Sequence, residues 1–316
     1  MDDFLGFDTS NYRTSCAVFG KNIAHKRKLL PVAEGQMGLR QNDAVFLHTK
    51  QLPLVFGELI KTGAVDYNSI KAVAASVSPT AENNSYMPCF SVGTSLALNL
   101  SSLLCVPFYS FSHQQGHIAA ALYSTKLLDL IEQPFIAFHV SGGTTECLLV
   151  NQKSNGDILN AEKLFCSLDL HAGQLIDRVG GMLNMQFPSG EELEKIALCG
   201  KNKHKIKTSF KDGNCCLSGI ENKCADMLKS ENPEDIARYL FEYIGTVLCE
   251  LVSNAKNIRG TNLPVVFSGG VMANSVIKNL ISQNHECYFA STEYSGDNAL
   301  GTALLCCYKH GGNINC

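Results

Sequence analysis

Two histidines four residues apart carry the clearest chemical signal in this sequence. They are His113 and His117 in the segment FSHQQGHIAAAL, whose apolar continuation predicts a helix. Residues four apart lie one turn apart on the same helix face. Two imidazole nitrogens placed there could bind one divalent metal ion, with a third ligand, preferably an oxygen, from elsewhere in the chain. A pair of capping or core histidines is the alternative interpretation.

An acid near the end of the chain is a candidate for that oxygen ligand. Asp297 lies in the segment YSGDNALG, near the expected start of a helix. It could equally be an N-cap residue. No Glu follows His113, so the HExxH motif of zinc peptidases is absent and a peptidase would lack its general base.

A glycine-rich turn offers a second kind of chemistry. The segment VSGGTT places Gly142 and Gly143 between two apolar runs that predict a β-hairpin. Glycines let the backbone approach a ligand closely or adopt positive φ. Successive backbone N–H groups would form a nest for a phosphate, with hydroxyl donors from Ser141, Thr144 and Thr145. An ordinary hairpin turn explains the same glycines.

A second glycine pair follows a predicted buried strand in the segment FSGGVMANS. Ligands of open α/β sheets lie beyond the carboxyl ends of strands, near helix N-termini. Gly269 and Gly270 would leave space there, and Asn274 could form a hydrogen bond with a base or a phosphate. Close packing of the helix on the strand is the alternative.

Asp177 lies in a third segment, LDLHAGQLIDRVGGML, which has the apolar spacing of a helix. In a cleft its carboxylate could accept hydrogen bonds from a ribose diol, whereas beside Arg178 it could be only a solvated ion pair. In the next segment, FPSGEELEKIA, Gly190 begins a predicted helix. Its early acids, which include Glu194, suit the helix dipole.

The hydrophobic pattern predicts the elements that position these residues. A faint internal repeat relates FLGFDTSNYRTSCAVF, from Phe4, to FIAFHVSGGTTECLLV, from Phe135. Each reads as a β-hairpin at the start of one half of the chain. Further strands are expected near 23–30, 70–76, 107–111, 161–165, 264–267 and 286–290, and helices near 43–61, 91–103, 170–183, 191–198, 233–255, after Gly270 and near 296–309.

Strands that alternate with helices predict an α/β protein with mostly parallel sheets covered on both faces. Two such halves resemble the duplicated actin-like fold of the actin, hexokinase and Hsp70 (ASKHA) proteins, in which a nucleotide lies between two lobes. We expect an N-terminal lobe at 1–130 and a C-terminal lobe at 131–295. The last helix, within 296–316, should pack near the N-terminal lobe.

Composition narrows the function classes. The chain has 316 residues, a formal net charge of −3 and 45% hydrophobic residues, which excludes a disordered chain and an overall basic field for nucleic acid or membrane. The basic run KNKHKIK, at 201–207, could contact a phosphate backbone or be a solvated loop. No run predicts a membrane span or a signal peptide, so we expect a cytoplasmic protein whose 14 Cys are reduced and mostly in the core.

Seven motifs, in order along the chain, resemble those of the TsaD family (formerly Gcp), the bacterial counterpart of the catalytic subunit of the KEOPS complex. They are LGFDTS, SHQQGH, HVSGGTT, DLHAGQLIDRVG, CLSGIENK, SGGVMANS and GDNA. The resemblance implies transfer of a threonylcarbamoyl group from threonylcarbamoyl-AMP to N6 of the adenosine next to the tRNA anticodon. It implies a cytoplasmic enzyme that works with TsaB-like and TsaE-like proteins, without a membrane, as a homo- or heterodimer through the N-terminal lobe.

The same resemblance implies roles for the candidate residues, although it identifies no catalytic side chain. His113, His117 and Asp297 would hold one divalent metal, iron or zinc, with magnesium as a third option. An adenylate or ATP-type nucleotide would be the ligand of the remaining residues. These are Ser141, Gly142, Gly143, Thr144 and Thr145 at the phosphate, Asp177, Gly190 and Glu194 at the ribose, and Asn274, after Gly269 and Gly270, at the adenine.

Three departures from the family pattern bear on the substrate. Tyr12 and Arg13 stand where the family has two acids in ETSCDET, and Thr144 stands where it has His or Asn. The stretch at 78–90, SPTAENNSYMPCF, replaces a Gly-Pro-Gly loop. Two alternatives therefore stay open: a paralogue that transfers a carbamoyl or acyl group from an adenylate to another acceptor, and a non-catalytic nucleotide-binding partner of a true TsaD.

Overall fold

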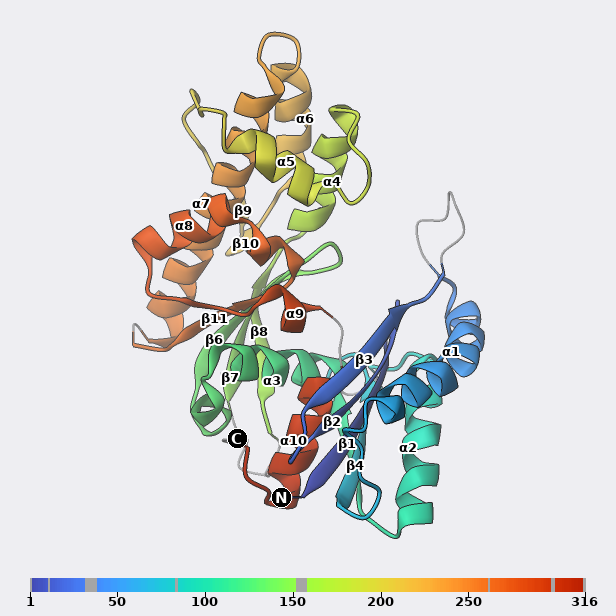
Figure 1. The fold of residues 1–316 in the computed structure, drawn as a ribbon. Coiled ribbons are helices and arrows are strands. Elements are labelled where there is room, and N and C mark those ends of the chain that lie inside the picture. Colours follow the sequence, from blue (N-terminus) through green and yellow to red (C-terminus); the bar gives the residue numbers. More distant parts are fainter. Residues whose placement is uncertain are drawn as a thin grey trace. The chain divides into compact units, whose positions relative to one another are not determined.

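The computed structural model describes residues 2–10, 12–31, 39–82, 85–151, 158–260, 262–296 and 299–314. These residues form two compact units (Figure 1). Unit 1 comprises the described residues of Met1–Ile131, Lys153–Asn160 and Tyr294–Cys316. Unit 2 comprises those of Glu132–Gln152 and Ala161–Glu293. The last helix of the chain therefore belongs to the first unit.

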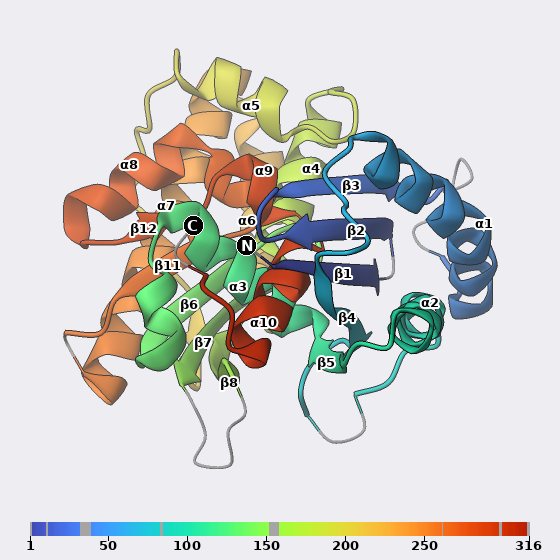
Figure 2. The same ribbon diagram turned by 60° about the horizontal axis from the view of Figure 1, so that its bottom comes forward.

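Unit 1 is built on a five-stranded sheet in the order β3-β2-β1-β4-β5. Its strands are β1 (Asp3–Ser10), β2 (Arg13–Phe19), β3 (Ala24–Leu29), β4 (Ile70–Ser78) and β5 (Phe108–Ser112). The first three are antiparallel, and β4 and β5 run parallel to β1. Figures 1 and 2 show α1 (Gln41–Lys61) and α2 (Phe90–Leu104) on one face, and α3 (His113–Thr125) and α10 (Leu300–His310) on the other.

Alternation along β1 explains which residues each layer contacts. Phe7 points into a core of buried residues that includes Leu52 and Val55 of α1. Gly6 points the other way, and a Cβ built on it would lie 2.5 Å from the Ala303 backbone nitrogen of α10. Glycine at position 6 therefore lets α10 pack directly on the centre of the sheet. Asp8 and Ser10 share that face with Gly6 because strand side chains alternate.

Unit 2 has a sheet of the same size in the order β12-β11-β6-β7-β8. Its strands are β6 (Phe135–Val140), β7 (Thr145–Asn151), β8 (Asn160–Cys166), β11 (Val265–Ser268) and β12 (Tyr288–Phe289). Its helices include α4 (Ala172–Met182), α5 (Gly190–Ala197), α6 (Ser218–Met227), α7 (Pro233–Arg259) and α8 (Ser275–Asn284). Its shorter elements are β9 (Phe210–Lys211), β10 (Asn214–Cys215) and η2 (Gly270–Ala273), while η1 (Leu128–Glu132) and α9 (Thr292–Ser295) cross the boundaries between the two units in the sequence. The core of the unit is formed around α7, whose apolar face is buried from Ile236 to Ala255.

The internal repeat corresponds to equivalent hairpins. Phe7 pairs with Cys16 across β1 and β2, and Phe138 pairs with Cys147 across β6 and β7. Both hairpins therefore have the same register. In each sheet the first strand of the hairpin also pairs with a parallel strand: β1 pairs with β4, and β6 pairs with β11. The predicted strands and helices are present within a few residues of their expected bounds.

The main differences lie in unit 2. The expected strand at 286–290 is only two residues long, and α6 and the small β9–β10 hairpin were not expected. Among the described residues, no helix is both long and apolar enough to cross a membrane. Each of the 13 cysteines in the described part of the chain is a free thiol, and Cys105 and Cys199 are exposed.

Candidate functional site

The two histidines of the first motif lie at the start of α3, directly after β5. Ser112 caps this helix: its hydroxyl accepts a hydrogen bond from the Gln115 backbone N–H at 3.2 Å, and its own N–H donates to Gln115 Oε1 at 2.7 Å. This capping box fixes where the helix begins. His113 is therefore the first helical residue, and His117 follows one turn later.

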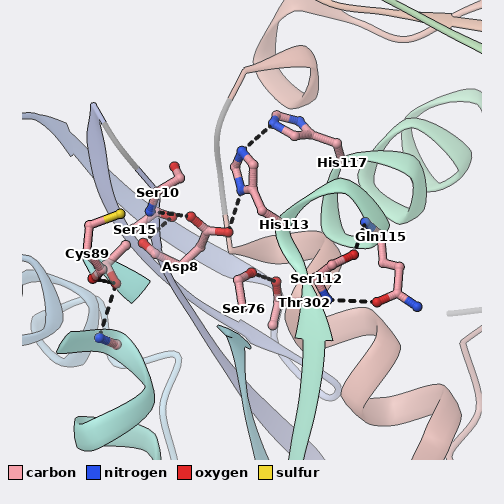
Figure 3. A network of polar contacts seen from close by, with 12 residues as sticks. Asp8, Ser10, Ser15, Ser76, Cys89, Ser112, His113, Gln115, His117 and Thr302 are labelled. Carbon is pink, nitrogen blue, oxygen red and sulfur yellow. Dashed lines mark hydrogen bonds and ion pairs between the residues drawn. The ribbon is translucent and has the colours of Figure 1, made fainter. Parts of the chain in front are cut away.

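The imidazoles of His113 and His117 face each other. Their Nε2 atoms are 2.9 Å apart, and Figure 3 shows the contact between the two rings as a dashed line. The Nδ1 atom of His113 lies 2.7 Å from Asp8 Oδ2, and the Asp8 side chain is 1% exposed. A carboxylate can only accept, so Nδ1 carries the hydrogen and the Nε2 lone pair of His113 points toward His117.

Asp8 is held in place by the end of its own hairpin. Its Oδ1 atom accepts a hydrogen bond from the Ser10 N–H at 2.9 Å, and its backbone oxygen accepts one from the Ser15 hydroxyl at 3.2 Å. Asp8 was not among the predicted site residues. The available signal was a charged residue inside LGFDTS, a strand that is otherwise buried, because a buried charge requires specific partners.

The distance between the two imidazoles allows the fit to a metal to be tested. Two nitrogens about 2.1 Å from one cation lie roughly 3.0 Å apart at a right angle and roughly 3.4 Å apart at a tetrahedral angle. The observed 2.9 Å therefore fits adjacent ligands of one cation, and it also fits a direct hydrogen bond. The described residues contain no group of three His, Cys, Asp or Glu side chains that could hold a metal. Asp297, the predicted third ligand, lies outside the described residues.

The glycine-rich turn joins β6 to β7 in unit 2. The Ser141 N–H donates to the Thr144 oxygen at 2.7 Å, and the Ser141 hydroxyl accepts from the Gly143 N–H at 3.3 Å. Two further hydrogen bonds attach the turn to the start of α4. The N–H of residue 172 donates to the Thr145 hydroxyl, and the N–H of residue 173 donates to the Ser141 backbone oxygen. The turn is therefore rigidly placed at a helix N-terminus, which favours anions.

Neither glycine of this turn is required by the fold. Gly142 and Gly143 have no positive φ. A Cβ built on either would meet no atom within 4 Å. An ordinary two-residue hairpin turn would need positive φ at a glycine. The backbone is therefore left open to solvent, which favours the interpretation in which a ligand approaches it.

In the second glycine pair, one glycine is explained by close packing and the other leaves space for a ligand. Gly269 has a φ of 100°, and a Cβ on it would lie 2.1 Å from the Val140 oxygen, so this glycine is required by packing. Gly270 has open space around it. Asn274 caps α8, with its Oδ1 accepting from the Ile277 N–H at 3.0 Å. Its Nδ2 is buried without a hydrogen-bond partner, which makes it a donor available to a ligand.

The two predicted ribose-side carboxylates connect α4, α5 and α8. Asp177 Oδ1 accepts from the Ser189 N–H, the residue before α5, at 2.9 Å. Burial raises the pKa of Asp177, and the Ser189 bond opposes this. Glu194 Oε1 accepts from the N–H and the hydroxyl of Ser275, at 2.7 and 2.5 Å. Gly190 makes only an ordinary contact, with its Cβ position 3.8 Å from Ile176.

The departure at position 13 places a cation on the face of the sheet that carries Asp8. Arg13 lies directly opposite Ser10 across the hairpin, next to the exposed Tyr12. It has no carboxylate partner among the described residues, and its guanidinium lies 2.8 Å from the position of a Cβ built on Gly296. Arg13 therefore adds a positive charge to the sheet face that carries Asp8.

The match to a family model decides the classification. The model of TsaD, tRNA N6-adenosine threonylcarbamoyltransferase, matches residues 32–304. The chain belongs to the TsaD family. The TsaD relatives named tRNA N6-adenosine threonylcarbamoyltransferase include one from Fervidobacterium nodosum, 30% identical over 93% of this chain and 89% of its own length. Another, from Prochlorococcus marinus, is 27% identical over 82% of this chain and 75% of its own length.

Solved structures confirm the predicted actin-like, duplicated fold. Component A of (R)-2-hydroxyglutaryl-CoA dehydratase from Acidaminococcus fermentans matches 98% of this chain and 100% of its own, with a TM-score of 0.54 and 15% identity. Full-length HypF in its phosphate- and nucleotide-bound form matches 98% of this chain and 56% of its own, with a TM-score of 0.60 and 14% identity. At these identities the likeness concerns the fold alone.

Proposed function

We propose that this TsaD-family chain transfers a threonylcarbamoyl group from threonylcarbamoyl-AMP to N6 of the adenosine next to the tRNA anticodon. A bond forms between N6 and the carbamoyl carbon, the bond from that carbon to the phosphate oxygen of AMP breaks, and N6 loses one proton. The observation that carries the proposal is the facing pair of imidazoles, with His113 oriented by a buried carboxylate. The family match supplies the reaction class.

His113 and His117, with Asp297, would hold the divalent cation, which polarises the carbonyl of the donor and balances its charge when bound. Asp8 keeps the lone pair of His113 Nε2 directed away from the sheet. Imidazole nitrogens suit iron and zinc, whereas magnesium, the third option, prefers oxygen ligands such as the carboxylate of Asp297. AMP is a good leaving group, so positioning of the two substrates supplies much of the rate, and we assign no catalytic side chain.

The adenylate would bind to unit 2. The exposed backbone of the turn at Gly142 and Gly143 would hold its phosphate, with Thr144 in the same turn. Asp177 and Glu194 each use one carboxylate oxygen in the fold, and the other oxygen would accept from a ribose hydroxyl. The Nδ2 donor of Asn274 would recognise the base.

The cellular setting is part of the same proposal. We place the reaction in the cytoplasm, with tRNA as acceptor and with TsaB-like and TsaE-like proteins as partners. A homo- or heterodimer would form through unit 1, as the family resemblance implies.

Metal analysis tests the site. The His113→Ala/His117→Ala variant should fold and lose its metal in elemental analysis, whereas His310→Ala, an exposed histidine of the same unit, should keep it. Stoichiometric metal in the double variant would remove this site. Calorimetry with AMP and ATP tests nucleotide binding. The chain should release heat on binding at least one of the two nucleotides at millimolar concentration. The Asn274→Ala variant should bind that nucleotide more weakly.

Complementation tests the reaction itself. Expression in a strain that lacks threonylcarbamoyladenosine should restore the modified nucleoside, as measured by mass spectrometry. Arg13 supports a second candidate, an adenylate-dependent transferase with another acceptor, because it stands where the family pattern has an acid, on the sheet face that carries Asp8. A failure to complement, with metal and nucleotide binding intact, would favour this candidate. A second chain with the ETSCDET pattern in the same genome would favour it too.

A further inference from the structure

The basic run after α5 has a regular pattern of exposure. From Lys201 to Phe210 every odd-numbered residue is exposed, and every even-numbered one is partly buried. The odd positions 201, 203, 205 and 207 are all lysines. An alternation of this kind is typical of an extended chain that lies on a surface. The segment follows α5, in yellow in Figure 1, and a bend at His204 curves it.

The inward-facing side chains anchor the segment to α7 and the turn before it. Asn202 Nδ2 donates to Glu242 at 2.9 Å, His204 Nε2 lies 2.6 Å from Glu231, and the Thr208 hydroxyl donates to Glu250 at 2.9 Å. Two further contacts hold its start. The Lys201 N–H donates to Asp235 at 2.7 Å, and a Cβ on Gly200 would lie 2.0 Å from the Glu234 oxygen. The lysine backbone is therefore fixed before any partner arrives.

The anchors also neutralise part of the charge. Lys203 forms an ion pair with Asp235, and the glutamates beneath the segment face its even-numbered side. Lys201, Lys205 and Lys207 are exposed, and none of them forms an ion pair within 4 Å of a carboxylate in the described part of the chain, although the charge of Lys201 helps to lower the pKa of Asp235. We call these three side chains the lysine row.

We propose that the lysine row is a contact surface for the phosphate backbone of RNA. In an extended chain, side chains two residues apart are separated by about 6.6 Å, and twice that across Lys203. This spacing corresponds to about two to four phosphates along a strand, which carries one charge per about 3.4 Å of duplex axis. Ammonium groups on fixed backbone positions would contact these charges without reading sequence. The partner class rests on the proposed tRNA acceptor, and the surface itself rests on unit 2 alone.

Salt dependence of RNA binding tests this surface. The probes are an unmodified tRNA transcript and an unrelated RNA hairpin, each titrated with the full chain and followed by fluorescence anisotropy. The Lys201→Gln/Lys205→Gln/Lys207→Gln variant should lower the slope of log K against log salt by about 2 to 3 for both RNAs. Between about 50 and 200 mM salt, wild-type affinity should fall roughly 20- to 40-fold more than that of the variant.

Matched variants separate this effect from a general change in charge. Replacing Lys50, Lys61 and Lys71, three exposed lysines of unit 1, by Gln removes the same charge and should leave the slope unchanged. The Lys→Arg triple variant of the row should keep the wild-type slope. Equal slopes for the Gln variant of the row and the wild type would overturn the proposal.

Three other outcomes are informative. Binding of polyglutamate, lost in the row variant while the RNA slope stays intact, would assign the row to an acidic protein instead and overturn the RNA contact. The His113→Ala/His117→Ala variant should lose transfer activity and keep the wild-type slope of log K against log salt, because the imidazole pair and the lysine row are separate sites. Failure of complementation together with a row-dependent slope for both RNAs would leave the RNA surface standing and reject the proposed acceptor chemistry.

Discussion

At the scale of single residues, Asp8 joins the fold to the imidazole pair. It accepts one hydrogen bond from His113 and one from the Ser10 N–H, on separate oxygens. Asn has only one acceptor oxygen, so Asp8→Asn loses one of these bonds. We expect the metal affinity measured by competition with a chelator to fall about 10- to 100-fold, as for other partners of metal-bound histidines.

The matched control for this variant is Asp43→Asn, which removes the same charge from an exposed position of unit 1. It should leave the metal affinity unchanged. The ¹⁵N chemical shifts of His113 provide a second measurement, since without the carboxylate its two tautomers become closer in population. Wild-type affinity and an unchanged tautomer in Asp8→Asn would show that Asp8 serves only the fold.

The turn glycines allow function to be separated from folding. Because no atom lies within 4 Å of a Cβ at Gly142 or Gly143, and neither has positive φ, replacing both by Ala should change the free energy of unfolding by less than about 1 kcal/mol. The added methyl groups would instead cover the exposed N–H groups of the turn. We expect AMP affinity by calorimetry to fall at least tenfold while the thermal midpoint stays within a few degrees. A parallel loss of stability would mean that the turn is structural.

At the scale of elements, α6 shows what the sequence could not reveal. The Asp169 carboxylate accepts hydrogen bonds from the Leu217 N–H at 2.7 Å and from the Ser218 hydroxyl at 2.6 Å. These donors are 48 and 49 residues away in the sequence, so the start of α6 is fixed by a remote group and by no local cap. By contrast, the hairpins and α3 follow local patterns of apolar residues and caps, and for this reason they were predicted.

The same difference applies to the site. The pairing of His113 with His117 is encoded in a four-residue spacing, whereas Asp8 reaches His113 across 105 residues. The turn at Gly142 was located by its own residues, but only the backbone angles and empty space around it decide between a hairpin requirement and a ligand. Asn274 was found by its type, while its unpartnered Nδ2 becomes evident only once the neighbours are placed.

Asp169 leads to a prediction about pH. Although partial burial opposes the charge, hydrogen bonds from Ser218, Leu217 and Leu170 lower the pKa of Asp169 below its ordinary value. A group with a lowered pKa in the folded state stabilises the fold above its unfolded pKa of about 3.9, and this contribution is lost as the pH falls through the folded value. Asp169→Asn should cost about 1 kcal/mol near pH 6, because the exposed carboxylate is screened by solvent.

The measurement is urea unfolding of the wild type and the variant between about pH 3 and pH 6. The difference in unfolding free energy should shrink toward the acid end, as the pH falls from the unfolded pKa of Asp169 toward its lowered folded pKa. Asp226→Asn, at an exposed carboxylate of α6 itself, is the control and should show a smaller difference at every pH. A constant difference across the range would mean that the charge of Asp169 contributes nothing to the capping of α6.

At the scale of the whole molecule, the last helix completes the first unit. Leu300, Leu304 and Leu305 of α10 are fully buried, and Gly301 packs so closely that a Cβ on it would lie 1.9 Å from the Gly116 oxygen of α3. Burial of three leucines contributes roughly 5 to 9 kcal/mol, which is comparable to the total stability of a domain. The chain truncated after Glu293 should therefore lose the structure of unit 1, including the sheet that carries Asp8.

Hydrogen exchange followed by mass spectrometry measures this by region. In the truncated chain, peptides from β1, β2 and α3 should exchange rapidly, while peptides from α7 and β6 should stay protected, because the core around α7 is formed within unit 2. A chain that ends at Gly311 keeps α10 and should exchange like the wild type. Protection of β1 in the truncated chain would mean that the first 131 residues hold their sheet without α10, and that the close packing at Gly6 and Gly301 is dispensable for folding.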